Sequence, residues 1–493
     1  MVETNLNILI SFIIYLSFML GIGWYFYSRT KNISDYILGG RKLNSFVTSL
    51  SAQASDMSGW LLLGLPGYAY IAGLEAVWLL IGLLIGTYLN WKFIAKRLRI
   101  YTEIAGDSYT LPDYFENRFQ TKSKRLRVVS AIFILIFFLI YTSSGFVAGA
   151  KLFSSVFGLS YSTSLFIGGL IIVSYTFLGG FQAVSWTDVF QGIIMLAAIV
   201  FVPIVAISIN GGITNTFFSI EKINPNLLNM FSLKNGETIP LLTIISLLGW
   251  GLGYYGQPHI LARFMAIENS NKINRSRKIA MIWVSISLIS ALILGIVGNT
   301  IISPPLINGD SEKVFIILVD KLINPLFSGI LLAAILSAIM STADSQLLVA
   351  SSSLVEDLYK PFLRPRASQI EYLWVGRGFV ILVAIIALGV GLNPNSSVLE
   401  LVSYAWAGLG ATFGPIVILS LYWKKITEKG ALIGILIGGI TVIVWKNISG
   451  GIFDLYEIVP AFLFATIAIY LVSLRTKILD EKKIDSEFIK LND

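Results

Sequence analysis

Long apolar runs, separated by short polar connections, follow one another along almost the whole chain. A helix that crosses the hydrocarbon core of a bilayer needs about 20 predominantly apolar residues. We therefore expect an all-α polytopic membrane protein with about 13 transmembrane helices. The runs near that length are residues 7–27, 43–70, 75–95, 128–157, 162–182, 188–208, 238–262, 278–302, 325–354, 372–392, 398–423, 430–448 and 454–474.

Basic residues are distributed unevenly between these runs. Lys and Arg gather after the first, third, seventh, ninth and eleventh runs and at the start of the tail, and Arg263 is the first basic residue after the seventh run. The connection 303–324 is nearly neutral, and we expect 211–237 to be a polar outside loop. Because cytoplasmic loops carry an excess of Lys and Arg, this pattern predicts the N-terminus outside and the C-terminus inside.

The composition agrees with this topology. Hydrophobic residues make up 55% of the 493 residues and charged residues only 13%, which leaves too little polar surface for a soluble globule. The net charge of +8 comes from the short connections, so it indicates a lipid bilayer and no nucleic acid as the partner. Cysteine is absent, and the single histidine, His259, excludes a multi-histidine metal site. We expect a multi-pass protein of the bacterial plasma membrane, with His259 as a hydrogen-bonded structural residue.

Two of the runs are interrupted by residues that disfavour a helix. The run 43–70 contains Ser, Gln, Asp and Gly between residues 51 and 59. The run 238–262 contains four glycines and a proline between residues 249 and 258. Glycine costs ~1 kcal/mol and proline ~3 kcal/mol in a helix interior, so we expect both helices to be broken.

The two broken runs lie five runs apart and therefore cross the membrane in opposite directions. This spacing predicts an inverted repeat, with repeat one at about 43–208 and repeat two at about 238–423. Paired broken helices in such repeats mark the binding site of many transporters. We predict one transporter domain, 1–477, and a charged, loosely ordered cytoplasmic tail, 478–493. The helices outside the repeats would be 7–27, 430–448 and 454–474.

Asp56 lies inside the first broken run. A charge at bilayer depth costs at least ~2.5–3.5 kcal/mol, so a carboxylate is rarely placed there without a use. The alternatives are a structural charge paired with a buried Arg from another span, and a charge at the membrane edge. Asp188 lies near the start of the sixth run. There a helix N-cap is as good an interpretation as a functional carboxylate.

A third unusual segment, residues 337–346 of the ninth run, is rich in hydroxyl groups. Ser337, Ser341 and Ser345 are four residues apart and share one helix face, with Thr342 beside them. Such hydroxyls, together with carbonyls freed in the first broken run, suit a monovalent cation such as sodium. The alternative is that they bond back to their own helix or join neighbouring helices. The acid-bearing broken run in the other repeat favours the ion site.

Aromatic residues also lie in or beside the unusual helices. In membrane spans they more often form packing contacts or interfacial belts than binding sites. Trp250 and Tyr254 flank the glycines of the second broken run, which favours a position at a cavity for these two. Nothing resembles a P-loop, a nucleophile elbow or the paired acids of a hydrolase, so we do not expect an enzyme.

Four motifs, in this order along the chain, resemble those of the sodium:solute symporter family. They are SAQASDMSGW at 51–60, GGFQAVSWTD at 179–188, WGLGYYGQPHILARF at 250–264 and AIMST at 338–342. The similarity runs from about residue 7 to 475 and includes DYILGGR at 35–41 and LVSYAWAG at 401–408. It implies a leucine-transporter-like core of five-plus-five inverted repeats, with one span before it and two after.

The resemblance also implies roles for individual residues. A sodium ion would be held by the carbonyls of Ala54, Met57 and Ala338 and the hydroxyls of Ser341 and Thr342. Asp56 would couple sodium to substrate from beside the ion, and Arg41 and Glu312 match positions that influence gating or coupling. The substrate would be lined by Ser58, Gly59, Trp60, Tyr141, Trp250, Tyr254 and Pro258.

Some related carriers have a second cation site, which here would consist of Asp188, Ser341, Asp344 and Ser345. Asp344 departs from the simple pattern of the family, so the number of sodium ions per substrate stays open.

Within the family, the motifs are most similar to those of L-proline carriers. We therefore expect sodium-coupled import of L-proline by alternating access, with sodium as the co-transported ion, no organic cofactor and no obligate protein partner. The alternatives are a sodium-coupled carrier of another amino acid, a sugar or a carboxylate, and a membrane sensor that uses the scaffold without transport.

Overall fold

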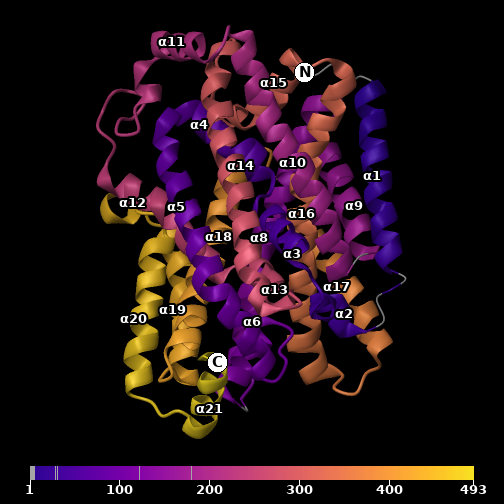
Figure 1. The fold of residues 1–493 in the computed structure, drawn as a ribbon, viewed down its shortest axis with the longest axis vertical. Helices are drawn as coiled ribbons and strands as arrows, with labels where there is room; N and C mark the ends of the chain where they lie inside the picture. Colours follow the sequence, from indigo (N-terminus) through magenta and orange to yellow (C-terminus); the bar gives the residue numbers. More distant parts are fainter. Residues whose placement is uncertain (1–5, 28, 30–31, 122, 179, 493) are drawn as a thin grey trace.

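The computed structural model describes residues 6–492 except 28, 30, 31, 122 and 179 (Figure 1). No β-strand occurs in this part of the chain beyond two isolated bridges, so the all-α prediction is confirmed. The α-helices are α1 (Leu6–Tyr27), α2 (Ile33–Leu38), α3 (Ser45–Asp56), α4 (Leu65–Ala72), α5 (Val77–Leu89), α6 (Ala95–Ile104), α7 (Leu111–Phe119), α8 (Arg125–Phe157), α9 (Tyr161–Leu178), α10 (Phe181–Ile209), α11 (Ile213–Ile223), α12 (Leu241–Gly249), α13 (Pro258–Ala266), α14 (Ile273–Ile301), α15 (Val314–Leu322), α16 (Pro325–Ser353), α17 (Gln369–Val390), α18 (Val398–Tyr422), α19 (Glu428–Lys446), α20 (Ile458–Leu474) and α21 (Glu481–Asn492).

Nine helical stretches of the described chain are long and apolar enough to cross a membrane. Three shorter apolar helices, Tyr161–Ser174, Leu241–Gly256 and Ile458–Leu474, coincide with three further predicted runs. The run predicted at 43–70 takes the form of α3 and α4, which are joined by an irregular segment. Gly73 separates α4 from α5: its φ is +68°, and a side chain there would collide with the backbone of Leu227.

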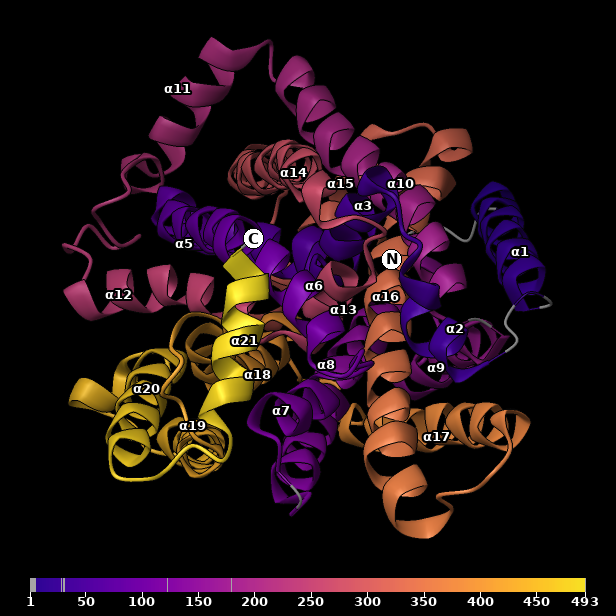
Figure 2. The same ribbon diagram turned by 60° about the horizontal axis from the view of Figure 1, so that its bottom comes forward.

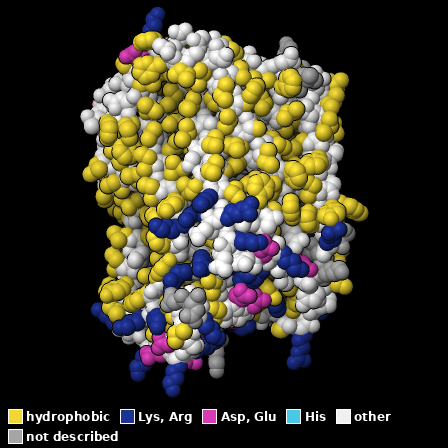
Figure 3. Space-filling model, in the orientation of Figure 1, with side chains coloured by type: hydrophobic (Ala, Val, Ile, Leu, Met, Phe, Trp, Pro, Cys, Tyr) yellow, Lys and Arg dark blue, Asp and Glu magenta, His cyan; other side chains and the backbone are white. Residues whose placement is uncertain are grey.

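The helices form a bundle with a clear centre and two flanks. α1 lies at one flank and α19 and α20 at the opposite one, whereas α3, α8, α13 and α16 lie toward the centre (Figures 1 and 2). On the face shown in Figure 3, hydrophobic side chains cover the upper part, and Lys and Arg side chains gather on the lower part. The helices predicted to lie outside the repeats are therefore peripheral.

The first predicted break separates α3 from α4. Asn44 caps the start of α3, because its side chain accepts two backbone hydrogen bonds from the first turn. The helix ends at Asp56, and Met57 leaves the helical region with a ψ of 72°. The chain resumes as a π-helical segment, Trp60–Gly64. Single π-helical turns of this kind occur frequently at functional sites.

The second predicted break separates α12 from α13. α12 continues into a 3₁₀ segment, Trp250–Gly256, and Gln257 is extended with a ψ of 106°. Pro258 then occupies the first turn of α13. Proline fits this position because the backbone N–H it lacks would have no partner inside the helix. Both predicted interruptions are confirmed.

The tail, predicted to be loosely ordered, contains a packed helix. It contains α21, in which Ile484, Phe488 and Leu491 are buried. Glu487 accepts a hydrogen bond of 3.0 Å from the Tyr101 hydroxyl, and burial raises the pKa of the Glu487 carboxyl. The prediction failed because the tail's charged residues hide an apolar stripe with helical spacing.

The connection 211–237 is less polar than predicted. It carries α11, in which the side chains of Ile213 and Phe218 are 78% and 59% exposed. An exposed apolar helix face next to a membrane-spanning bundle is typical of a helix lying in the membrane interface.

Candidate functional site

The hydroxyl-rich part of α16 faces the end of α3. Ser341 Oγ donates to the carbonyl oxygen of Ala54 over 2.8 Å, and Thr342 Oγ1 lies 3.4 Å from the same oxygen. Ser341 Oγ also lies 3.3 Å from the carbonyl oxygen of Ala338. Four of the five residues predicted to hold sodium are thus buried together where the two halves of the chain meet.

The break at the end of α3 explains why the carbonyls of Ala54 and Met57 are available. In a regular helix, the Ala54 oxygen would accept the N–H of Ser58. Here Ser58 N–H donates to Asp56 O, and Leu61 N–H donates to Ser58 O and not to Met57 O, each over 3.0 Å. The oxygens of Ala54 and Met57 are therefore released from the helix ladder. In the described part of the chain no group of three or more His, Cys, Asp or Glu could hold a metal ion.

Asp56 lies beside this group of oxygens from Ala54, Ala338, Ser341 and Thr342, which we call the oxygen cage. Its Oδ2 accepts a hydrogen bond of 2.8 Å from the Tyr254 hydroxyl, and its Oδ1 has no hydrogen-bond partner among the described residues. The backbone oxygen of Asp56 accepts from Trp60 Nε1 at 3.2 Å and from the Tyr141 hydroxyl at 3.3 Å. No basic side chain pairs with Asp56 in this part of the chain, so the alternative of a buried Arg partner is wrong. Three of the predicted substrate residues converge on Asp56.

The aromatic residues of the two broken helices form one buried cluster. The ring centroids of Trp60 and Trp250 are 6.3 Å apart, and Trp250 stacks on Tyr456 at 5.4 Å. Tyr254 meets Trp406 edge-on at 5.0 Å, and Trp406 Nε1 donates to the Trp250 carbonyl over 2.8 Å. No role for Trp406 or Tyr456 is predicted from the sequence, although Trp406 lies within one of the family motifs.

Ser58 and Gly59 lie at the edge of this cluster. Ser58 Oγ is 3.4 Å from the backbone nitrogen of Trp60. Gly59 packs so closely on α8 that an added Cβ would lie 2.8 Å from that of Ala148. A glycine at this position therefore allows the segment that follows the break to approach α8.

Pro258 lies on a different cavity, of about 20 Å³, which is also lined by Thr110 and Ser353. Both hydroxyls donate to Asp357, at 2.9 and 2.7 Å. Arg127 lies 3.5 Å from Asp357 and also pairs with two carboxylates on α7. This buried ion cluster is not apparent in the sequence, because its members come from three separate segments. None of the predicted substrate aromatics is among the residues that line this cavity.

His259 follows Pro258 and is fully buried. Both of its ring nitrogens lack hydrogen-bond partners among the described residues, so the predicted hydrogen-bonded histidine is wrong. Its ring packs edge-on against Phe138 and Tyr141, with centroids 5.6 and 5.9 Å away.

Asp188 lies inside α10, which begins at Phe181, so its interpretation as an N-cap is wrong. Asp188 Oδ2 accepts a hydrogen bond of 2.6 Å from Ser51 Oγ and pairs with Arg263 Nη2 at 3.2 Å. The assignment of Arg263 to a cytoplasmic loop is also wrong, because Arg263 is a fully buried residue of α13. Such a cation offsets the cost of desolvating a carboxylate in a low-dielectric interior.

Arg263 also reaches the predicted second cation site. It donates to Ser345 Oγ, which in turn lies 3.3 Å from Asp344 Oδ1. The buried Asp188 thus pairs directly with the Arg263 guanidinium, and the buried Asp344 is linked to it through Ser345 Oγ. The signal that could have found Arg263 is Asp188 itself, because a buried base is one way to stabilise an acid inside a span.

Arg41 lies just after α2, away from the oxygen cage. It pairs with Asp107 at 3.0 Å and donates to the carbonyls of Ser108 and Met265 at 2.8 and 2.6 Å. Burial and the neighbouring Arg99 guanidinium lower the pKa of Arg41 from its usual value. Arg41 thus links the segment before α3 to the ends of α6 and α13.

Glu312 lies just before α15 and caps the N-terminus of α18. It accepts hydrogen bonds from Ser397 Oγ at 2.9 Å and from the backbone nitrogens of Val398 and Leu399 at 3.1 and 3.0 Å, and it pairs with Lys151. The helix dipole favours a carboxylate there. α2 and α15 lie at opposite ends of the bundle, so the two predicted gating residues belong to opposite ends of the molecule (Figure 1).

Helices that break at the centre of a membrane-spanning bundle, beside released carbonyls and a buried acid, define a class: ion-coupled membrane transporters. The model of the sodium:solute symporter family matches residues 36–438. This chain belongs to the sodium:solute symporter family and is a multi-pass membrane transporter, not an enzyme.

The comparisons also identify individual relatives. The sodium/proline symporter of Salmonella typhimurium strain LT2 is 50% identical over 474 residues, which are 95% of this chain and 93% of that protein. The osmoregulated proline transporter OpuE of Bacillus subtilis strain 168 is 48% identical over 96% of each chain. The structure of a Na⁺-coupled sialic acid symporter, in a substrate-bound outward-open state, aligns with a TM-score of 0.81 and 18% identity over 97% of this chain and 100% of that one. This last similarity shows a shared leucine-transporter-like fold.

Proposed function

We propose that this protein imports L-proline together with sodium by alternating access. The observation that carries the proposal is the convergence of the Ser341 and Thr342 hydroxyls on the Ala54 carbonyl, at the point where α3 breaks. The choice of proline rests on the two relatives that are 48–50% identical over nearly the full length, a sodium/proline symporter and an osmoregulated proline transporter.

We further propose the topology on which this function depends. Thirteen spans place the N-terminus outside and the C-terminus inside, and repeats 43–208 and 238–423 lie within one transporter domain, 1–477. Support comes from the basic side chains on the lower part of the molecule, where α21 also lies (Figures 1 and 3). The membrane potential would then add ~2.3 kcal/mol per charge per 100 mV to the inward driving force.

In this proposal the sodium ligands are the carbonyls of Ala54, Met57 and Ala338 and the hydroxyls of Ser341 and Thr342. The ion joins α3 to α16 and so holds together elements of both repeats. Asp56 senses the ion from beside the cage and passes its effect to the aromatic cluster through Tyr254. By linkage, sodium raises the affinity for proline and proline raises the affinity for sodium by the same factor.

We place proline against Trp60, Tyr141, Trp250 and Tyr254, with Ser58 and Gly59 at the broken end of the helix. A substrate carboxylate fits the free N–H groups at the start of a half-helix, where the dipole favours an anion. The ring would then pack on the aromatic side chains. We propose that Pro258 lies on the path of the substrate, between this site and the cavity that Pro258 lines with Thr110 and Ser353.

Uptake of labelled proline into proteoliposomes tests the function. An inward sodium gradient should drive proline accumulation, and an equal potassium gradient should not. Excess unlabelled proline should abolish the signal, whereas competition by another amino acid, a sugar or a carboxylate with proline ineffective would identify a different substrate. Specific binding of proline without any uptake would favour the sensor alternative.

The same vesicles test the proposed second cation site at Asp188, Ser341, Asp344 and Ser345. The ratio of labelled sodium to labelled proline should exceed one in the wild type and fall in Asp344→Ser. A ratio of one in both proteins would remove the second site from the mechanism.

Trp250→Ala should weaken the apparent affinity for proline by about tenfold or more. Removing the indole takes away the contacts with Trp60 and Tyr456, and burying a large aromatic ring stabilises a complex by ~1.5–3 kcal/mol. The measurement is the proline concentration that gives half-maximal uptake at saturating sodium. Trp374→Ala, at a 53% exposed tryptophan on α17, is the matched control and should leave that concentration unchanged. An unchanged affinity in Trp250→Ala would show that this lining is wrong.

A further inference from the structure

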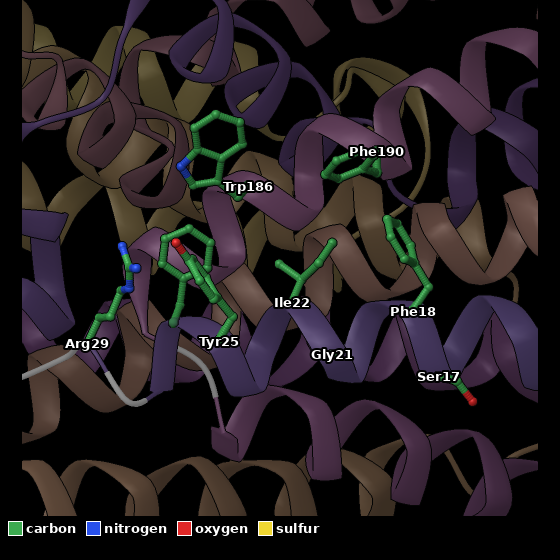
Figure 4. Close-up of a pocket in the computed structure, with 9 residues that line it drawn as sticks. Ser17, Phe18, Gly21, Ile22, Tyr25, Arg29, Trp186 and Phe190 are labelled. Carbon is green, nitrogen blue, oxygen red and sulfur yellow. The ribbon is translucent and has the colours of Figure 1, made fainter.

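The outer face of the bundle carries a groove between α1 and α10. Its volume is about 790 Å³, and its lining includes the apolar side chains of Phe18, Ile22, Trp186 and Phe190 (Figure 4). Phe18 and Phe190 meet edge-on across the two helices, with ring centroids 5.2 Å apart. Hydrocarbon chains of the bilayer border a groove of this kind on a pair of membrane-spanning helices. The groove can bind such a chain, because the helices satisfy their own backbone hydrogen bonds.

One end of the groove is cationic. Arg29 lines it, with its guanidinium 4.2 Å from the centre of the Tyr25 ring. Within the described part of the chain no carboxylate pairs with Arg29. Trp186 lies near this end of the groove and Phe18 at the other end (Figure 4). Tryptophan and tyrosine are enriched at the level of lipid headgroups, so the Arg29 end corresponds to the headgroups and the Phe18 end to the acyl chains.

The charge pattern places this end in the cytoplasmic leaflet. α1 starts outside in the proposed topology, so Arg29, which follows its last turn, lies at the cytoplasmic surface. That leaflet contains anionic phospholipids, which attract basic residues at the surface by ~1 kcal/mol each, about fivefold in affinity. An arginine also binds phosphate through a planar fork of N–H donors.

We propose that this groove is a binding site for one anionic phospholipid, with its phosphate on Arg29 and an acyl chain along Phe18, Ile22 and Phe190. The bound lipid fills the space between α1 and α10. α10 also carries Asp188, two residues after Trp186, so the lipid lies against the helix that holds the buried ion pair.

Two variants separate the parts of the proposed site. Arg29→Gln removes the charge and keeps the groove. Gly21→Leu fills the groove, because a side chain at Gly21 meets no atom within 4 Å. The matched controls are Arg366→Gln, at an exposed arginine of another basic connection, and Gly378→Leu, at a glycine of α17 that also faces open space.

Native mass spectrometry of the full-length, delipidated protein measures the first lipid bound. Phosphatidylglycerol and phosphatidylcholine with identical acyl chains are titrated separately. We expect the wild type to prefer phosphatidylglycerol by about fivefold. Arg29→Gln should lose the preference, and Gly21→Leu should weaken binding of both lipids. Both controls should match the wild type.

Two results would overturn the proposal. One is a preference for phosphatidylglycerol that persists in Arg29→Gln or is lost equally in Arg366→Gln, since the charge would then act from elsewhere. The other is a dimer peak that disappears in Gly21→Leu while lipid binding stays unchanged, since a second copy of the chain would then occupy the groove.

Discussion

Arg263→Gln is expected to lower the stability of the folded protein by about 3–5 kcal/mol, because it leaves a buried carboxylate without its cation. Arg263 is fully buried, and it is the basic side chain that pairs with Asp188, at 3.2 Å. The variant also leaves Ser345 without its donor. The expected result is a large drop in the midpoint of thermal unfolding in detergent, together with loss of uptake.

A double-mutant cycle separates the ion pair from general damage to α13. Asp188→Asn with Arg263→Gln removes both charges and should recover much of the stability that either single variant loses. Arg275→Gln, at an exposed position on α14, is the control for removing one positive charge. A midpoint for Arg263→Gln within a degree or two of the Arg275→Gln value would mean that the pair contributes little to folding.

The helices and their breaks follow from local chemistry, and for this reason the sequence predicts them well. Runs of about 20 apolar residues can only be helices in lipid, where every backbone group must find an internal partner. Glycine, serine and proline residues predict the break after Asp56 and the break before Pro258. The oxygen cage follows from the same logic, because a break releases carbonyls and a serine face on α16 can supply hydroxyls.

The ion pairs could not be predicted from the sequence, because they depend on packing between distant segments. Asp188 and Arg263 are 75 positions apart, and Lys151 and Glu312 are 161 apart. The sequence predicts Arg263 in a loop because it directly follows the seventh apolar run, 238–262. Only the packing of α13 on α3 and α6, with the Arg263 side chain against Asp188 of α10, shows that it is buried. α21 was not predicted for a related reason. Its three buried apolar residues lie among many charges, and they indicate a packed helix only once α6 is known to cover them.

Removing the hydroxyl of Ser341 or Thr342 is expected to raise the sodium concentration for half-maximal proline uptake by about 10- to 100-fold. An oxygen that binds a charged group contributes ~1.5–3 kcal/mol, and each 1.4 kcal/mol is a factor of ten in affinity. Ser341→Ala should have the larger effect, because its Oγ lies 2.8 Å from the Ala54 oxygen and that of Thr342 lies 3.4 Å away. By linkage, the apparent proline affinity at a fixed, low sodium concentration should fall by a similar factor.

Ser337→Ala is the matched control for both variants. Ser337 lies on the same face of α16, one turn before Ser341, but its hydroxyl donates to the Ala333 carbonyl of its own helix over 2.9 Å. Its removal should therefore leave the sodium dependence unchanged. If all three alanine variants shift the sodium concentration alike, the hydroxyls act through the packing of α16 and not as ligands. If Ser341→Ala and Thr342→Ala both keep the wild-type value, sodium binds elsewhere, and the convergence on Ala54 is only a contact between helices.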